Sequence, residues 1–162
     1  MGYTTTFTGS IRVEPALTTA EAQFLLDFSR SDHDGEPKAP GKHCDWVPAE
    51  PILDGFGFAT IEHNGSEKSY DAVEWLQFLI DEFLKPGSSG GPQGGLLTRD
   101  HVLDGVIEAN GEEHGDYWRL VVKSNAVTRE EPITIWASDN VQQPVIVPGE
   151  IVRDQWFFET RR

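Results

Sequence analysis

The residues His43, Cys44 and Asp45 place an imidazole, a thiol and a carboxylate next to one another. A nucleophilic cysteine needs a neighbouring base of this kind. Adjacent residues of a strand point to opposite faces, however, so His43 is poorly placed to activate Cys44. The simpler interpretation is that Cys44 is a small core residue on the same side as Trp46. We therefore predict no catalytic residue.

Two other clusters contain residue types that bind divalent metals. They are Asp32, His33 and Asp34, and then Glu112, Glu113, His114 and Asp116. Both offer hard oxygen ligands with one imidazole, but neither has the ligand spacing that marks a zinc site. Solvated turns are the simpler interpretation, so we predict no metal and no cofactor. A metal-dependent hydrolase built from Glu108, Glu112 and His114 remains the enzyme hypothesis.

The tryptophans indicate a possible ligand pocket. Trp46, Trp118 and Trp136 are candidates to line a pocket that stacks a base or another flat, nucleotide-like ligand. Packing in the hydrophobic core is the commoner role of such residues. Sequestration of a small ligand in such a pocket is the alternative to the function that the acidic residues indicate, which is binding of a protein partner.

Acidic residues cluster around one segment of the chain and indicate a binding surface. The candidate partner-binding residues are Glu67, Asp71, Glu74, Asp81 and Glu82. Carboxylates spaced like phosphates could compete for the basic groove of a DNA-binding protein. The alternative is an ordinary solvated helix face.

The overall charge restricts the classes of partner. The 162 residues include 27 acidic and 13 basic side chains, a formal net charge of −14. Such a surface repels nucleic acid and anionic membranes, so neither is an expected partner. It favours a host protein with a basic surface, although acidity also simply keeps a protein in solution.

The segment from Ser69 to Pro86 must position most of these carboxylates, and its pattern predicts a helix. Asp71 is expected to cap the first turn in a capping box with Glu74, and Tyr70 to pack on Trp75 as a staple. Apolar residues recur at helical spacing on one face: Ala72, Val73, Leu76, Leu79, Ile80 and Phe83. Pro86 and Gly87 are expected to end the helix.

The alternation of apolar and polar residues, together with turn-forming residues, predicts the remaining helix, strands and loops. A half-buried strand is predicted over residues 3–14, bent at Gly9 and stopped by Pro15. Thr18 and Glu21 form a capping box that starts a second helix, which runs to Arg30. Exposed loops are predicted at 31–42 and 86–95, and strands at 43–47, 57–62, 102–109, 117–123 and 133–136.

These elements predict an α+β fold. We expect one domain over residues 1–162, with a mostly antiparallel sheet, two helices packed on one face and a split βαβ arrangement. A reversal at Ser124-Asn125 leads into a strand-rich C-terminal extension. The loop at 86–95 holds five glycines and is expected to be flexible.

The compartment is predicted from cysteine usage and from the absence of targeting features. Cys44 is the only cysteine, which excludes an internal disulfide and fits a reducing cytosol. The first residues lack the basic start and apolar run of an export signal, and no stretch is long enough to span a membrane. A cytoplasmic location is the expectation.

Several segments resemble a group of small hypothetical proteins of bacteria and their phages. They are the strand from Cys44 to Pro48, the helix from Val73 to Pro86, the hairpin from Leu103 to Asp116 and the stretch from Val122 to Val127. The resemblance covers about half of the chain; the glycine-rich run and the tail after Val127 depart from it. It implies a non-enzymatic accessory protein of phage or mobile-element type that binds a host protein through its acidic surface.

Overall fold

The computed structural model describes residues 3–50 and 57–133, which form a six-stranded antiparallel sheet and two helices. The strands are β1 (Thr5–Leu17), β2 (Trp46–Pro48), β3 (Phe58–His63), β4 (Val102–Gly111), β5 (Tyr117–Lys123) and β6 (Ala126–Glu130). The helices are α1 (Thr19–Arg30) and α2 (Ala72–Leu79), and α2 continues directly into the π-helical turn η1 (Ile80–Leu84). The α+β fold class is thus confirmed.

The strand order is β2-β3-β1-β4-β5-β6, and every neighbouring pair is antiparallel. Two strands that are each antiparallel to the strand between them run parallel to each other. Consequently β3-α2-β4 is a βαβ unit split by β1, and β1-α1-β2 is a second one split by β3. Two interlocked split βαβ units are the ferredoxin-like topology. The strands β5 and β6 extend that sheet at the β4 edge.

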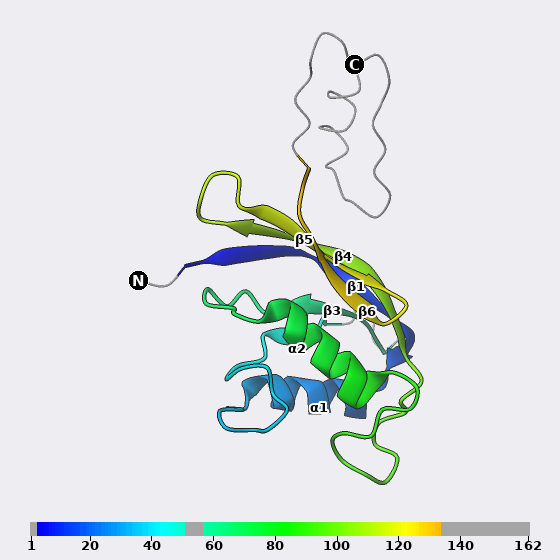
Figure 1. Ribbon diagram of the computed structural model, residues 1–162. Coiled ribbons are helices and arrows are strands. Elements are labelled where there is room, and N and C mark those ends of the chain that lie inside the picture. Colours follow the sequence, from blue (N-terminus) through cyan, green and yellow to red (C-terminus); the bar gives the residue numbers. More distant parts are fainter. Residues whose placement is uncertain (1–2, 51–56, 134–162) are drawn as a thin grey trace, which may run out of the picture.

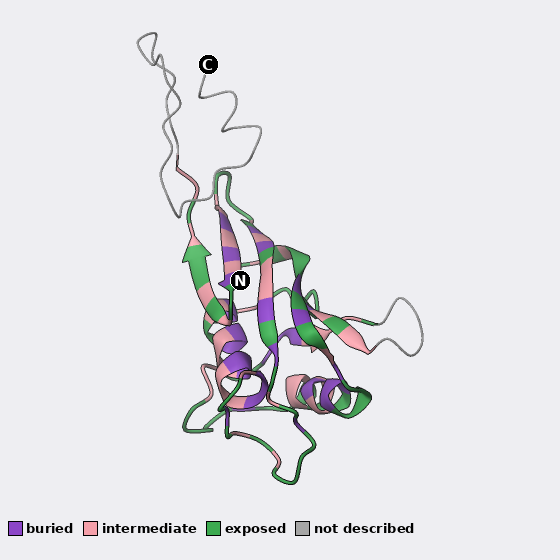
Figure 2. Cartoon of the chain, turned by 90° about the vertical axis from the view of Figure 1, so that its right-hand side faces the viewer, coloured by how far each residue is buried: buried purple, intermediate pink, exposed green. Residues whose placement is uncertain are grey.

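Both helices lie on the same face of the sheet, as Figure 1 shows. Buried and exposed positions alternate along the strands, so each strand turns one row of side chains toward the helices (Figure 2). The buried side chains form one continuous cluster between the two layers. Its largest fully buried members include Trp46, Trp75, Ile11, Leu76, Leu103 and Ile107.

The first strand is longer than its sequence predicts. Gly9 has φ 122°, and a β carbon there would lie 2.7 Å from the carbonyl oxygen of Val106, so this position requires a glycine. The prediction that Pro15 stops the strand is wrong, because β1 continues to Leu17. Pro15 lies where the register with β3 shifts, an irregular position where its missing N–H costs no ladder hydrogen bond.

The two predicted capping boxes have different outcomes. In α1 the Thr18 hydroxyl accepts from the Glu21 N–H at 3.2 Å, and the Glu21 carboxylate accepts from the Thr18 N–H at 2.8 Å, which confirms that box. In α2 the predicted box is wrong, because Asp71 has φ 58° and its side chain makes no capping hydrogen bond. Asp71 tolerates this left-handed conformation better than most residues do.

The Tyr70 staple is also absent, since Tyr70 is 59% exposed while Trp75 is 1% exposed. The predicted end of the helix is confirmed within a residue or two, because helical structure stops at Leu84.

Hydrogen bonds from Arg99 hold the glycine-rich loop that follows the helix. The Arg99 guanidinium donates to the carbonyls of Glu82 at 3.2 Å and Gly90 at 2.7 Å.

The predicted hairpin of β4 and β5 and the reversal into β6 are confirmed. Ser124 and Asn125 have φ 47° and 72°, the two left-handed residues of a tight hairpin turn. The Asn125 side chain also accepts from the Leu103 N–H at 2.8 Å and donates to the His101 carbonyl at 3.0 Å. The turn residue thereby holds the start of β4.

Gln77 of α2 closes part of the open edge of β6. Its side-chain oxygen accepts from the Val127 N–H at 2.8 Å, and its nitrogen donates to the Asn125 carbonyl at 3.1 Å. These are backbone groups that an edge strand otherwise leaves unpaired. The carboxamide therefore fastens the helix layer to the edge of the sheet.

We expect Gln77→Ala to lower the free energy of unfolding by about 2 kcal/mol, because two hydrogen bonds to backbone groups are lost. Urea denaturation monitored by circular dichroism measures this change. Gln23→Ala is the matched control, since Gln23 hydrogen bonds only to exposed Asp27 and its loss should cost less than about 0.5 kcal/mol. Equal losses in the two variants would contradict the edge-fastening role.

Within residues 3–50 and 57–133, no helix is long and apolar enough to cross a membrane. The predicted strand at 133–136 lies outside the described residues apart from Ile133, and so does the chain that follows it.

Candidate functional site

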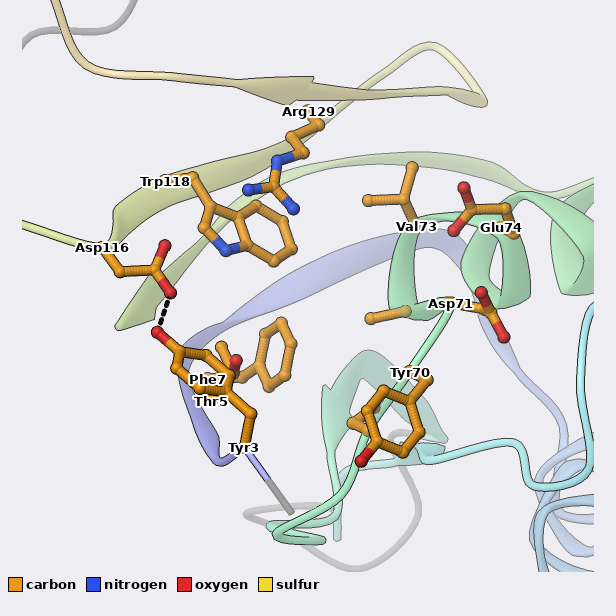
Figure 3. A pocket seen from close by; sticks show the side chains of 12 residues that line it. Tyr3, Thr5, Phe7, Tyr70, Asp71, Val73, Glu74, Asp116, Trp118 and Arg129 are labelled. Atoms are coloured by element: carbon orange, nitrogen blue, oxygen red, sulfur yellow. Dashed lines mark hydrogen bonds between the residues drawn. The ribbon is translucent and has the colours of Figure 1, made fainter. Parts of the chain in front are cut away.

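A cavity of about 450 Å³ opens between the N-terminal end of α2 and the sheet. We call it the α2–sheet pocket. Its lining comes from the start of β1 and the residues before it, the approach to α2 and its first turn, the β4–β5 turn, and the strands β5 and β6 (Figure 3). The lining residues are Tyr3, Thr5, Phe7, Ser69, Tyr70, Asp71, Ala72, Val73, Glu74, Asp116, Trp118 and Arg129. Aromatic rings and carboxylates therefore meet in one cavity.

The aromatic part of the pocket is built around Trp118. Phe7 packs edge-on against the Trp118 indole, with ring centroids 5.7 Å apart and an interplanar angle of 84°. Arg129 of the neighbouring strand places its guanidinium carbon 4.1 Å from the centroid of the same indole, a cation–π contact (Figure 3). The pocket thus already holds one cation of its own chain on an aromatic face.

The carboxylates of the pocket lie on two sides. Asp71 and Glu74 come from the α2 side, and among the described residues neither carboxylate has a hydrogen bond or an ion pair. Asp116 comes from the β4–β5 turn and accepts a hydrogen bond from the Tyr3 hydroxyl (Figure 3). That hydrogen bond raises the pKa of Tyr3. Asp71 and Glu74 are consequently the lining carboxylates that have no partner among the described residues.

The five predicted partner-binding residues fall into two groups. Asp81 pairs with Lys85 at 2.7 Å, and Glu82 pairs with Lys38 at 3.3 Å, so cations of the chain itself neutralise both. Asp71 and Glu74 are brought together at the pocket. Glu67 is exposed in the segment before α2 and does not line the cavity. The carboxylates of this set that no lysine neutralises therefore lie in and just before the N-terminal end of α2.

The three predicted pocket tryptophans are not brought together. Trp118 lines the α2–sheet pocket. Trp46 is 1% exposed, and its indole N–H donates to the Ala72 carbonyl at 2.8 Å, so it belongs to the core beneath the helix. Trp136 lies outside the described residues. Of the predicted set, Trp118 is the ring placed to contact a ligand.

Cys44 is placed as the core residue that the alternation predicted. It is 1% exposed, whereas His43 is exposed on the surface. Burial raises the pKa of the Cys44 thiol to about 12, so the thiolate that nucleophilic catalysis requires is disfavoured.

The two possible metal clusters bond within the chain instead of converging. His33 is 2% exposed, although the loop around it was predicted to be exposed; its Nδ1 faces Glu36 at 3.0 Å and its Nε2 faces the Phe28 carbonyl at 2.8 Å. Both nitrogens are thereby engaged.

Of the residues named for a hydrolase, Glu108 accepts from the Tyr117 hydroxyl at 2.9 Å, and Glu112 of the second cluster accepts from the Thr4 N–H at 3.1 Å. Within the part of the chain that the structure describes, no three metal-ligating side chains gather around a common point. The hydrolase hypothesis, which also needs His114, gains no geometric support from these contacts.

Sequence reasoning missed most of the pocket lining, above all Tyr3, Phe7, Asp116 and Arg129. The alternation of β1 placed Tyr3 and Phe7 on one face, but it does not tell what that face meets. Arg129 follows Val127 by two residues in β6, so both point to the helix side; this spacing was the available indication.

No protein-family model, curated protein sequence or solved structure matches this chain. The chemistry of the pocket therefore has to be argued from its own residues. Aromatic faces and unpaired carboxylates both attract cations, and the flat guanidinium group suits both. The arrangement is suited to holding a positively charged side chain.

Proposed function

We propose that this protein is a non-enzymatic interaction protein of phage or mobile-element type, which binds a host protein with a basic surface. The α2–sheet pocket receives a cationic side chain of that partner. The observation that carries the proposal is the pairing of two unpartnered carboxylates, Asp71 and Glu74, with the aromatic face of Trp118 in one cavity. The expectation that the partner is a host protein comes from the resemblance, expected from the sequence, to small proteins of bacteria and phages.

The charge of the whole chain supports the same partner chemistry. A formal net charge of −14 attracts basic surfaces at a distance and accelerates encounter with them. At short range, contacts of carboxylates and an aromatic ring with a cation provide specificity. The same carboxylates oppose a nucleotide in this pocket, since they would repel its phosphates.

A titration with defined peptides tests the proposal. A labelled peptide of alternating arginine and glycine should bind the full chain, and binding should weaken as NaCl is raised from about 50 mM to about 500 mM. A peptide of alternating glutamate and glycine should not bind. In the variant Asp71→Asn/Glu74→Gln, the affinity for the basic peptide should fall about tenfold. Fluorescence anisotropy measures each dissociation constant.

The matched control removes two carboxylate charges elsewhere. Glu14→Gln/Asp27→Asn changes the net charge by the same amount at exposed positions on β1 and α1. If both double variants weaken binding equally, the peptide recognises only the overall charge and the pocket has no role. If the wild-type chain fails to bind the basic peptide at low salt, the proposed function is wrong.

A further inference from the structure

The Trp118 ring is covered within its own pocket. It is 6% exposed, although it lines a cavity of about 450 Å³, and the guanidinium of Arg129 lies 4.1 Å from its centroid. A ligand cannot stack on this indole face while Arg129 occupies it. Either the ring has no binding role, or Arg129 moves when a ligand enters.

Arg129 is held by contacts that are easily exchanged. Its Nε donates to the Glu131 carboxylate at 2.5 Å, and the two side chains are 48% and 60% exposed. Glu131 lies just beyond the end of β6, and an exposed ion pair of this kind contributes little to stability, because water and salt screen it. An exposed arginine also regains rotamer freedom when it is released. Its displacement from the indole is therefore inexpensive.

We propose that the α2–sheet pocket is an arginine-recognition site, in which Arg129 is an intramolecular stand-in that a partner's arginine replaces. The inference rests on the proposed function and specifies its ligand chemistry. The indole face accepts a planar guanidinium, and the free carboxylates of Asp71 and Glu74 line the same cavity. An ammonium group lacks the plane and the paired donors that such a site uses.

Removal of the stand-in should strengthen binding of a free arginine. The probes are N-acetyl-arginine methylamide and N-acetyl-lysine methylamide, titrated into the full chain and followed by the indole N–H signals in nitrogen-15 correlation spectra. Comparison with Trp118→Phe assigns the Trp118 signal. We expect Arg129→Ala to bind the arginine probe about tenfold more tightly than the wild type does, with the Trp118 signal shifting most. The lysine probe should bind more weakly to both proteins.

Two variants distinguish displacement of Arg129 from the indole from the effect of removing one positive charge. Arg12→Ala removes the same charge from another exposed strand ion pair, with Glu14 at 3.8 Å, and should bind like the wild type. Arg129→Lys keeps the charge but loses the planar stack, so it should bind the arginine probe more tightly than the wild type does. Thermal denaturation checks that each variant is folded. If Arg129→Ala does not fold, Glu131→Ala replaces it, because the freed Arg129 should compete less well.

The outcomes distinguish this inference from the proposed function. If the basic peptide binds through Asp71 and Glu74 but Arg129→Ala binds the arginine probe no more tightly than Arg12→Ala does, the stand-in role is wrong and the proposed function stands. Equal affinities for the arginine and lysine probes would overturn the guanidinium assignment. If the arginine probe replaces Arg129 but the peptide does not bind, the proposed function fails while the pocket chemistry is retained.

Discussion

Replacing Trp75 with alanine is expected to lower the free energy of unfolding by about 4 kcal/mol. Trp75 is 1% exposed. Its indole packs between the helices and the loop after α1, with ring centroids 5.4 Å from Phe78, 6.1 Å from Phe28 and 5.3 Å from His33. Alanine would leave a cavity that these rings fill only partly, because they are held on separate elements.

Tyr70→Ala is the matched control for Trp75, as another aromatic residue at the start of the same helix. Tyr70 is 59% exposed and should contribute less than about 0.5 kcal/mol. Urea denaturation of the two variants gives both values. A large loss in Tyr70→Ala would show that the hydrophobic staple predicted from the sequence forms after all. A loss of less than about 1 kcal/mol in Trp75→Ala would contradict its place in the core.

Replacing Glu21 with alanine is expected to lower the free energy of unfolding by about 3 kcal/mol. The Glu21 side chain is buried and accepts hydrogen bonds from the N–H groups of Thr98 at 2.6 Å and Thr18 at 2.8 Å. Its Oε1 also lies 3.1 Å from Nε2 of His101, whose Nδ1 lies 2.7 Å from the Pro15 carbonyl. One carboxylate therefore ties the loop before β4 to the start of α1.

The same carboxylate makes stability depend on acid pH. Burial by itself would raise the pKa of Glu21, but hydrogen bonds from Thr98, Thr18 and His101 outweigh burial and lower it from 4.5 to about 2. Between these values the unfolded chain binds the proton and the folded chain does not. The stabilisation is complete above pH 4.5 and is lost as the pH falls toward about 2. At about 1.4 kcal/mol per pH unit, it amounts to about 3 kcal/mol.

Two further variants test this pH dependence. In Glu21→Gln the group no longer ionises, so the free energy of unfolding should fall less steeply below pH 4.5 than in the wild type. Asp27→Asn is the control on the same helix; Asp27 is exposed and accepts one hydrogen bond from Gln23, so the acid-dependent loss should stay as in the wild type. Identical acid profiles for Glu21→Gln and the wild type would refute the assigned role of Glu21.

Local rules predicted most elements well, and they failed at Asp71 and at Pro15. Thr18 and Glu21 are neighbours in sequence, so their capping box was predictable. Asp71 has the same kind of pattern with Glu74, yet its backbone is left-handed, with φ 58°, and no box forms. Likewise Pro15 does not end β1, because partner strands on both sides hold the chain extended around it. Propensity yields to tertiary pairing at such positions.

In the candidate site, too, some features could be predicted from the sequence and others depend on tertiary structure. The sequence by itself determined the acidic charge, the α+β class and the helix that carries Asp71 and Glu74, because these depend on composition and on periodicity within single segments. Only the tertiary structure decided that Lys38 neutralises Glu82 at the far end of that helix. Lys38 comes from a separate loop, more than forty positions away in the sequence.

Tertiary structure alone also decided that Arg129 covers Trp118 beside those carboxylates. The pocket joins β1, the start of α2, β5 and β6, and strand order is what brings these segments together. A single sequence carries the side-chain alternation of each strand but not which strands become neighbours or which helix faces them, since those are set by the packing of the whole core. The acidic helix was visible from the sequence; its aromatic, arginine-occupied cavity was not.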